Sequence, residues 1–180
     1  MDNINLESKL TQLDDIMVHV GFVMKAGHKL SRKLMLSGEE DKAIGLLQRI
    51  LMHDFSKSLV DEFYGMAKFS EDMASMKDPN VKRVADGKMD AIKLHWSRND
   101  HHPEFWTAVM PNTLTNSEPI EISSEMSELS IAEMCCDWYA RSMQFNSNVL
   151  DFYKIMSKDR WKFTKEQDEL IVKFLSMLQE

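Results

Sequence analysis

The sequence is short of the residues that build several common kinds of fold and site. Its 180 residues include two cysteines, six glycines and four prolines. The cysteines, Cys135 and Cys136, are adjacent, so they lack the C-x-x-C spacing of a zinc knuckle and cannot easily bond to each other. We expect them to be small, buried packing residues. The glycines are scattered, which argues against a phosphate-binding P-loop and against a Rossmann fold.

Positive charge and long apolar runs are scarce as well. No run approaches the roughly 18 apolar residues that cross a membrane, and the first ten residues, MDNINLESKL, lack the basic and apolar regions of a secretory signal. We therefore expect a cytoplasmic protein with no membrane partner. With 22 Lys and Arg against 29 Asp and Glu, the net charge is −7. This charge argues against binding to long nucleic acids, which depends on basic residues displacing phosphate counterions.

The apolar pattern predicts a single all-α domain over residues 1–180, a helical bundle without strands. Residues spaced by three and four predict a first helix whose buried stripe is Leu6, Leu10, Leu13, Met17, Val20 and Met24. Further helices are expected from about residue 43 into HDFSK, over VDEFYGMAKF, and over about 81–98, 128–156 and 164–179. Residues 107–127 carry two prolines and many Ser, Thr and Asn, which predicts a long loop or lid.

Polar residues stand at several positions where the helical pattern expects apolar ones. The stripe of the second helix continues by three- and four-residue steps onto His53 and Asp54, and a buried carboxylate needs a cation or strong hydrogen bonds. His19, His95 and Asp137 also lie beside apolar stripes of their helices. Histidine nitrogen and aspartate oxygen suit Mn, Fe, Co, Ni or Zn, and bundles assemble such sites from facing helices.

The segment HWSRNDHHPEFW, residues 95–106, holds three of the six histidines. Pro103 disfavours helical geometry at His102, so the helix that carries His95 should end within this segment. His101 and His102 would then turn in from the broken helix end. The segment is predicted to form part of the same metal site, although a cluster of histidines on a solvated helix end is the simpler alternative.

The order of these residues resembles the H…HD…D signature of the HD-domain superfamily, which consists of all-helical, metal-dependent phosphohydrolases. HDFSK is similar to the HDxxK form of its cyclic-di-nucleotide phosphodiesterases and dinucleoside-tetraphosphate hydrolases. The combination of HDxSK, HxxxNxHHPE and EMxxDW looks more like an uncharacterised HD-like family of phages and bacteria. The likeness spans about residues 16–145.

The resemblance implies an HD-like bundle that holds one or two divalent transition-metal ions. It makes ligands of one ion out of His19, His53, Asp54 and Asp137. Asp54 could then bridge to a second ion held by His95 and by His101 or His102. His28 is the alternative to His19 as the first ligand, but the residues HVGFV around His19 fit the family's first motif better.

The resemblance departs from the 5′-deoxynucleotidase branch at one position, because Lys57 stands where that branch has a catalytic glutamate. Either Glu62 or Glu104 substitutes for the missing carboxylate, or Lys57 only binds phosphate. The catalytic candidates are therefore Asp54, Lys57, Glu62 and Glu104. The candidate substrate contacts are Lys57, Arg98, Asn99 and Trp106, of which Trp106 could stack on a base.

The function implied is that of an enzyme that hydrolyses the phosphomonoester of a (deoxy)nucleoside monophosphate with metal-activated water. Hydrolysis of a nucleoside triphosphate or of a cyclic or dinucleotide stays open. So do di-iron oxygenase chemistry on the same fold and a non-catalytic HD-like binding module. The expected partner is a small phosphorylated substrate, a homodimer is left open, and the compartment is the cytoplasm, that of the host if a phage encodes the protein.

Overall fold

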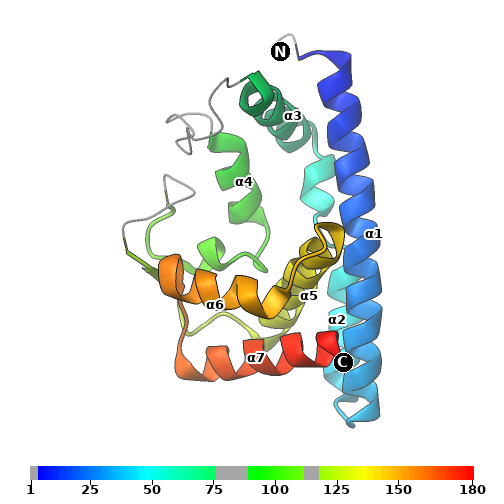
Figure 1. Cartoon of the computed structure of the whole chain (residues 1–180), viewed down its shortest axis with the longest axis vertical. Helices are drawn as coiled ribbons and strands as arrows, with labels where there is room; N and C mark the ends of the chain where they lie inside the picture. Colours follow the sequence, from blue (N-terminus) through cyan, green and yellow to red (C-terminus); the bar gives the residue numbers. More distant parts are fainter. Residues whose placement is uncertain (1–3, 76–88, 112–117) are drawn as a thin grey trace.

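Two antiparallel helices begin the computed structural model, which describes residues 4–75, 89–111 and 118–180. α1 (Leu6–Leu36) starts where the Asn5 side chain accepts a hydrogen bond from the Ser8 amide, and α2 (Glu40–Leu51) runs back along it (Figure 1). The turn between them uses Gly38 in the left-handed region, at φ 82°. The two helices approach closely because Gly27 has no side chain: a Cβ there would lie 2.5 Å from the Ile50 side chain.

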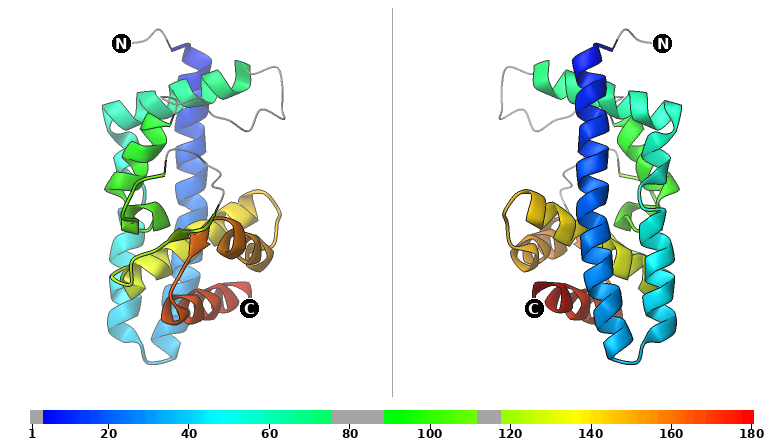
Figure 2. Two further views of the ribbon diagram at one scale, coloured as in Figure 1. Left: turned by 90° about the vertical axis from the view of Figure 1, so that its left-hand side faces the viewer. Right: turned by 90° about the vertical axis from the view of Figure 1, so that its right-hand side faces the viewer.

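The other elements lie on one side of α1, as Figure 1 and the two views of Figure 2 show. In chain order they are the 3₁₀ turn η1 (Phe55–Ser58), α3 (Val60–Ser75), α4 (Asp90–Arg98), the 3₁₀ turn η2 (Pro103–Trp106), β1 (Ile120–Glu121), α5 (Glu128–Gln144), α6 (Val149–Asp159), β2 (Trp161–Lys162) and α7 (Lys165–Gln179). The prediction of an all-α fold is confirmed. Among the described helices, none has the length and apolarity needed to cross a membrane.

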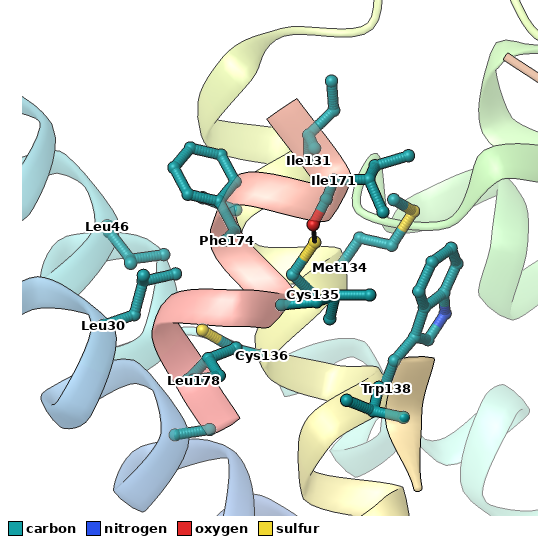
Figure 3. Close-up of a cluster of buried hydrophobic side chains, with 14 of the residues drawn as sticks. Leu30, Leu46, Ile131, Met134, Cys135, Cys136, Trp138, Ile171, Phe174 and Leu178 are labelled. Atoms are coloured by element: carbon teal, nitrogen blue, oxygen red, sulfur yellow. Dashed lines mark hydrogen bonds between the residues drawn. The ribbon is translucent and has the colours of Figure 1, made fainter. Parts of the chain in front are cut away.

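The hydrophobic core lies where α5 packs between α7 and the α1–α2 pair (Figure 3). Cys135 and Cys136 of α5 are fully buried there as free thiols, as predicted for small packing residues. Burial raises the pKa of both thiols well above the usual value. Trp138 on the next turn stacks on Trp161 at 5.2 Å between ring centroids. Trp138 therefore anchors α5 in this core.

The predicted buried stripe of α1 was wrong. Its members are exposed instead, apart from the half-buried Val20: Leu6, for example, is 69% exposed and Met17 is 67% exposed. The face that packs against the core comprises Gln12, His19, Val23, Ala26, Gly27, Leu30, Ser31 and Leu34. Both faces of α1 carry apolar residues at helical spacing, so periodicity alone cannot tell which one the other helices cover.

The helix predicted over 128–156 is broken into α5 and α6. Asn146 adopts the left-handed conformation (φ 50°), and the Asn148 side chain accepts hydrogen bonds from the Leu150 and Asp151 amides at the start of α6. Asparagine tolerates this conformation and caps helices well, which explains the break. The helix predicted over 164–179 is confirmed by α7, which begins with a capping box of Thr164 and Gln167.

The segment predicted as one loop over 107–127 contains a short strand. β1 pairs in parallel with β2, with Ile120 opposite Trp161, and so ties the end of this segment to the core. A two-residue strand is too short to show an alternating pattern, which is why the sequence did not predict it. The centre of the predicted loop, 112–117, and the first part of the helix predicted over 81–98 lie outside the described residues.

Candidate metal centre

The predicted metal ligands meet in one buried cluster. α1 supplies His19, the turn after α2 supplies His53 and Asp54, the last turn of α4 supplies His95, the turn before η2 supplies His101 and His102, and α5 supplies Asp137. Within the described part of the chain, three sets of side chains have ligand atoms within 4.8 Å of one another and could hold a metal ion: Asp54 with His95, His101 and His102; Asp54 with His19 and His53; and Asp137 with His53 and His101.

Asp54 lies at the centre of the cluster. α2 ends at Leu51, so His53 and Asp54 do not continue its helical stripe as predicted. The chain turns instead, and Asp54 takes the left-handed conformation at φ 56°, a strained choice for a residue other than glycine. Its Oδ2 lies 3.4 Å from Nε2 of His53, and its Oδ1 lies 3.3 Å from Nε2 of His95. The two oxygens of one carboxylate thus face two different groups of histidines.

The remaining ligand atoms surround this carboxylate. Nε2 of His19 lies 3.0 Å from Oδ1 of Asp137 and 3.6 Å from Oδ2 of Asp54. Nε2 of His101 lies 3.5 Å from Oδ1 of Asp54, and Nε2 of His102 lies 2.8 Å from Nε2 of His95. Four histidines of the cluster therefore have Nε2 within 3.6 Å of a carboxylate oxygen: His19, His53, His95 and His101. His102 is the exception in the cluster.

Several of these atoms are buried without a hydrogen bond to any described residue. They include Oδ1 of Asp54, Nε2 of His101 and Oδ1 of Asp137. Buried polar atoms normally have hydrogen-bond partners, and a missing ion is one explanation when they do not. Nitrogen from histidine and oxygen from aspartate form a donor set that first-row transition metals accept. The residues present therefore fit a divalent metal ion.

Two buried glutamates orient the histidines from behind. Glu133 of α5 lies 2.9 Å from Nδ1 of His53 and 3.3 Å from Nδ1 of His101. Glu62 of α3 lies 2.6 Å from Nδ1 of His95. In metal sites such carboxylates fix the ring orientation and leave the other nitrogen free for the metal. Glu62 was one of the catalytic candidates, and the structure places its carboxylate against Nδ1 of His95, where it can orient that ring.

Sequence reasoning gave no role to Glu133, although it belongs to the EMxxDW motif. It lies one helical turn before Asp137, and this spacing could have identified it as a second carboxylate on the same face of α5. Its other oxygen accepts a hydrogen bond from Arg49 at 2.7 Å. Arg49 also pairs with Asp100, so α2 and the histidine-rich segment are tied together behind the cluster.

Burial sets the protonation of most of the cluster. It lowers the pKa of His19 and of His95, in spite of their carboxylate neighbours, and it lowers the pKa of His102 well below the usual value. A low pKa keeps an imidazole neutral, which is the form that binds metal. Burial acts to raise the pKa of Asp54 and Asp137, but nearby histidines, with Lys57 at Asp54, hold both well below the usual value.

His53 is the exception. Burial acts to lower its pKa, but Asp54 and Glu133 outweigh burial and raise it. A protonated His53 would balance part of the negative charge that Asp54, Asp137 and Glu133 bring together. A metal ion would supply the same balance and displace that proton.

Lys57 is the cation nearest the centre of the cluster. Its Nζ lies 2.5 Å from Oδ2 of Asp54. Arg98 is less available, because it pairs with Asp61 at 2.6 Å and with Glu62 at 3.5 Å. Arg141, one turn after Asp137 on α5, is close enough that its charge helps to lower the pKa of His19, after the larger effect of burial. In the sequence, Arg141 is one of the few cations near the motifs, with Lys57 and Arg98.

The other candidates have contacts of their own. The Asn99 side-chain amide donates to the His95 carbonyl at 2.7 Å and to Ser56 Oγ at 2.7 Å, so it supports the end of α4. Glu104 is buried and accepts from Arg160 at 2.6 Å and from the Trp161 indole at 3.1 Å, which places its carboxylate outside the ligand sets. The Trp106 indole donates to the Asp100 carbonyl at 2.6 Å.

The two alternatives for the first ligand differ in burial. His19 is 1% exposed and belongs to a ligand set, whereas His28 lies at the surface, on the wall of a groove between α1 and α2. Around the cluster, most side chains are fully buried, but His102 and Lys57 are half-buried.

Fold and cluster together define an all-helical protein with a buried histidine and aspartate site that could hold a metal ion. Residues 8–177 match the model of DUF5662, a family of unknown function, and the chain belongs to that family. Neither the curated proteins nor the solved structures gave a match to the chain. The likeness to HD-domain phosphohydrolases therefore stays a prediction.

Proposed function

We propose that this protein is a metal-dependent phosphohydrolase that acts on a small phosphorylated substrate, a (deoxy)nucleoside monophosphate. The observation that carries the proposal is the position of Asp54. Its two oxygens face His53 and His95 at 3.4 and 3.3 Å, so a single carboxylate joins two groups of nitrogen ligands. Two-metal sites of phosphatases are built around shared ligands of this kind.

In this proposal the residues form two ligand groups that share Asp54. His19 and His53 would complete the first group, with Asp137 beside His19 at 3.0 Å, and His95, His101 and His102 would complete the second. Mn, Fe, Co, Ni and Zn all suit this donor set. When bound, such a metal lowers the pKa of water and neutralises negative charge on phosphoryl oxygens.

The chain's own side chains would bind and orient the phosphate. Lys57 is half-buried beside Asp54, and its ammonium can move from Asp54 to a phosphoryl oxygen once a metal neutralises that carboxylate. Arg141 adds a second positive charge near His19. The carboxylates of Glu62 and Glu104 are engaged by His95 and Arg160, so the proton for the leaving alkoxide comes from solvent in this proposal.

The charge of the protein favours a small substrate. A net charge of −7 repels a long polyanion. Near the cluster, Arg49 and Arg98 pair with carboxylates outside the ligand sets, whereas Lys57 pairs with Asp54, whose charge a metal would neutralise. Lys57 and Arg141 are therefore the cations proposed to attract phosphate. The two positive charges of Lys57 and Arg141 are enough to bind one terminal phosphate in this proposal.

The test is a phosphate-release screen of untagged protein loaded in turn with Mn, Co, Ni or Mg. The panel contains nucleoside monophosphates and triphosphates, scored by free phosphate. It also contains cyclic nucleotides and dinucleotides, scored by chromatography of the nucleotide products because their hydrolysis frees no phosphate. We expect release from monophosphates that is lost after chelation, restored by a transition metal, and absent in Asp54→Asn. Metal-loaded protein that releases phosphate from no nucleoside monophosphate would refute the proposal.

A further inference from the structure

The outer face of α1 is apolar, and among the described residues no other element packs over it (Figure 2). The exposed members are separated by three or four residues or by sums of these steps: Leu6, Leu10, Leu13, Met17, Met24 and Met35, exposed by 69, 52, 48, 67, 47 and 42%. We call this set the outer stripe. Steps of three and four are the spacing by which one helix packs against another in a coiled coil.

The outer stripe continues onto α2. Ile44, Leu47 and Leu51 follow the same spacing and are 43, 39 and 70% exposed. Leu47 also lines a groove between α1 and α2 with Met35. The apolar face therefore extends over both helices of the hairpin. Single exposed apolar side chains are normal on a protein surface, but a contiguous apolar face of this kind marks an interaction site.

The middle residue of α1 on this face is a glycine. α1 spans Leu6–Leu36, and Gly21 lies at its midpoint, one turn from both Met17 and Met24. A Cβ on Gly21 would meet no atom within 4 Å, so the packing of its own chain does not require a glycine there. Glycine disfavours a helix interior and is useful where another backbone approaches closely.

The charges beside the outer stripe change sign at the same midpoint. On one flank of the stripe, the exposed acids Glu7 and Asp14 precede Gly21, whereas the exposed bases Lys25 and Arg32 follow it. Lys9, on the other flank, is the exception in the first half. Two such helices side by side in parallel would set like charges together. In an antiparallel pair, the acidic half of each helix faces the basic half of the other.

We propose that α1 pairs with α1 of a second copy of this chain, antiparallel, about a two-fold axis at Gly21. Such an interface is isologous, because the same surface of each copy meets itself. A 31-residue helix is about 46 Å long. That length holds about four heptads, enough for a stable helix pair. The exposed residues of α2 flank the pair, and the proposal does not depend on the proposed function.

Sedimentation equilibrium tests this interface directly. The wild type should be a dimer, and Met17→Glu should weaken its dissociation constant at least 100-fold. Because Met17 is exposed, the monomer should keep the helicity of the wild type. Ile155→Glu is the matched control, since Ile155 is 57% exposed on α6, away from the stripe, and it should leave the dimer intact.

A wild type that stays monomeric at 100 µM, whether or not it binds anionic phospholipid vesicles, overturns the proposal. So does Met17→Glu with the dissociation constant of the wild type. Gly21→Leu should also weaken the dimer at least tenfold, because a side chain at the axis would separate the helices. An unchanged dimer in that variant places the axis elsewhere and overturns the model.

Cross-linking tests the antiparallel direction. The native cysteines are fully buried, so an introduced surface cysteine reports alone. With a mild oxidant, Glu7→Cys mixed with Arg32→Cys should give the mixed disulfide in preference to either homodisulfide. Predominant Glu7→Cys homodisulfide would show parallel helices and contradict the arrangement.

Discussion

The Glu133 carboxylate lies 2.9 Å from Nδ1 of His53, and this contact turns Nε2 of the imidazole toward the cluster. Both side chains are buried, at 4% exposure each. The contact therefore fixes the nitrogen that a metal would meet. A second oxygen of the same carboxylate is held by Arg49, so the orienting group is itself held in place.

Replacing this carboxylate should weaken metal binding. We expect Glu133→Gln to lower metal affinity about 10- to 100-fold, the usual effect of losing such a partner. Calorimetric titration of metal-free protein measures it. Glu128→Gln, which removes the Lys42 ion pair at the start of the same helix, is the control and should keep the affinity. Equal affinities in the two variants would mean that Glu133 does not orient a ligand.

Lys57 should act through its charge on substrate. In the metal-loaded enzyme, Lys57→Ala should raise KM about tenfold, whereas Lys57→Arg should recover most of the loss, because the phosphate loses or regains a cation. Lys68→Ala serves as the control, since Lys68 forms exposed pairs with Glu71 and Asp72 on α3. If Lys57→Ala has the KM of the wild type, Lys57 has no contact with the phosphate.

Glu104 should contribute to stability and not to turnover. Its carboxylate is 2% exposed and pairs with Arg160, so Glu104→Gln should lower the free energy of unfolding by about 2 kcal/mol. Glu121→Gln removes an exposed pair with Lys162 and should change the stability far less, because solvent screens that pair. Urea unfolding measures both. A large fall in kcat of folded Glu104→Gln would instead return Glu104 to the catalytic group.

Glu39 should make stability depend on pH in acid. Hydrogen bonds from Lys42 and Lys173 lower its pKa from 4.5 to about 2. A depressed folded-state pKa stabilises the protein fully above the unfolded value and loses that contribution as the pH falls toward 2. The wild type should thus exceed Glu39→Gln in stability at pH 7, modestly because the pairs are exposed.

Thermal unfolding of wild type and Glu39→Gln at pH 7, 5, 4 and 3 checks this expectation. The difference in Tm should be constant from pH 7 to 5 and shrink below pH 4.5. A difference that stays constant down to pH 3 would show that ionisation of Glu39 does not contribute. Glu125→Gln, at an exposed carboxyl before α5, should show no difference at any of these pH values.

The sequence predicted the helical class and the ligand cluster because both follow from residue type and spacing. Histidine and aspartate at apolar positions of separate helices can be buried only if they meet, and they do. It could not predict Glu133 and Glu62 as orienting groups, because their role depends on which ring nitrogen faces them. The sequence also could not predict the turn that places Asp54. His53 and Asp54 keep the helical spacing of the stripe, although α2 ends at Leu51.

The sequence also could not predict which face of α1 packs against the core. The stripe of Leu6, Leu10 and Met17 has the stronger apolar spacing, yet α1 buries the face of Val23, Leu30 and Leu34. An amphipathic pattern identifies an apolar face but not its partner. If a second copy covers the outer stripe, both faces of α1 are buried, and the original periodicity is explained.

Metal titration followed by anomalous scattering tests the central claim most directly. Metal-free wild type titrated with Mn should bind close to two equivalents of metal, and His95→Ala should bind close to one. Asp54→Asn should bind neither ion tightly, because Asp54 serves both ligand groups. Anomalous peaks in metal-loaded crystals should lie on either side of the Asp54 carboxylate. A wild type that binds no metal at the Asp54 carboxylate would contradict the account.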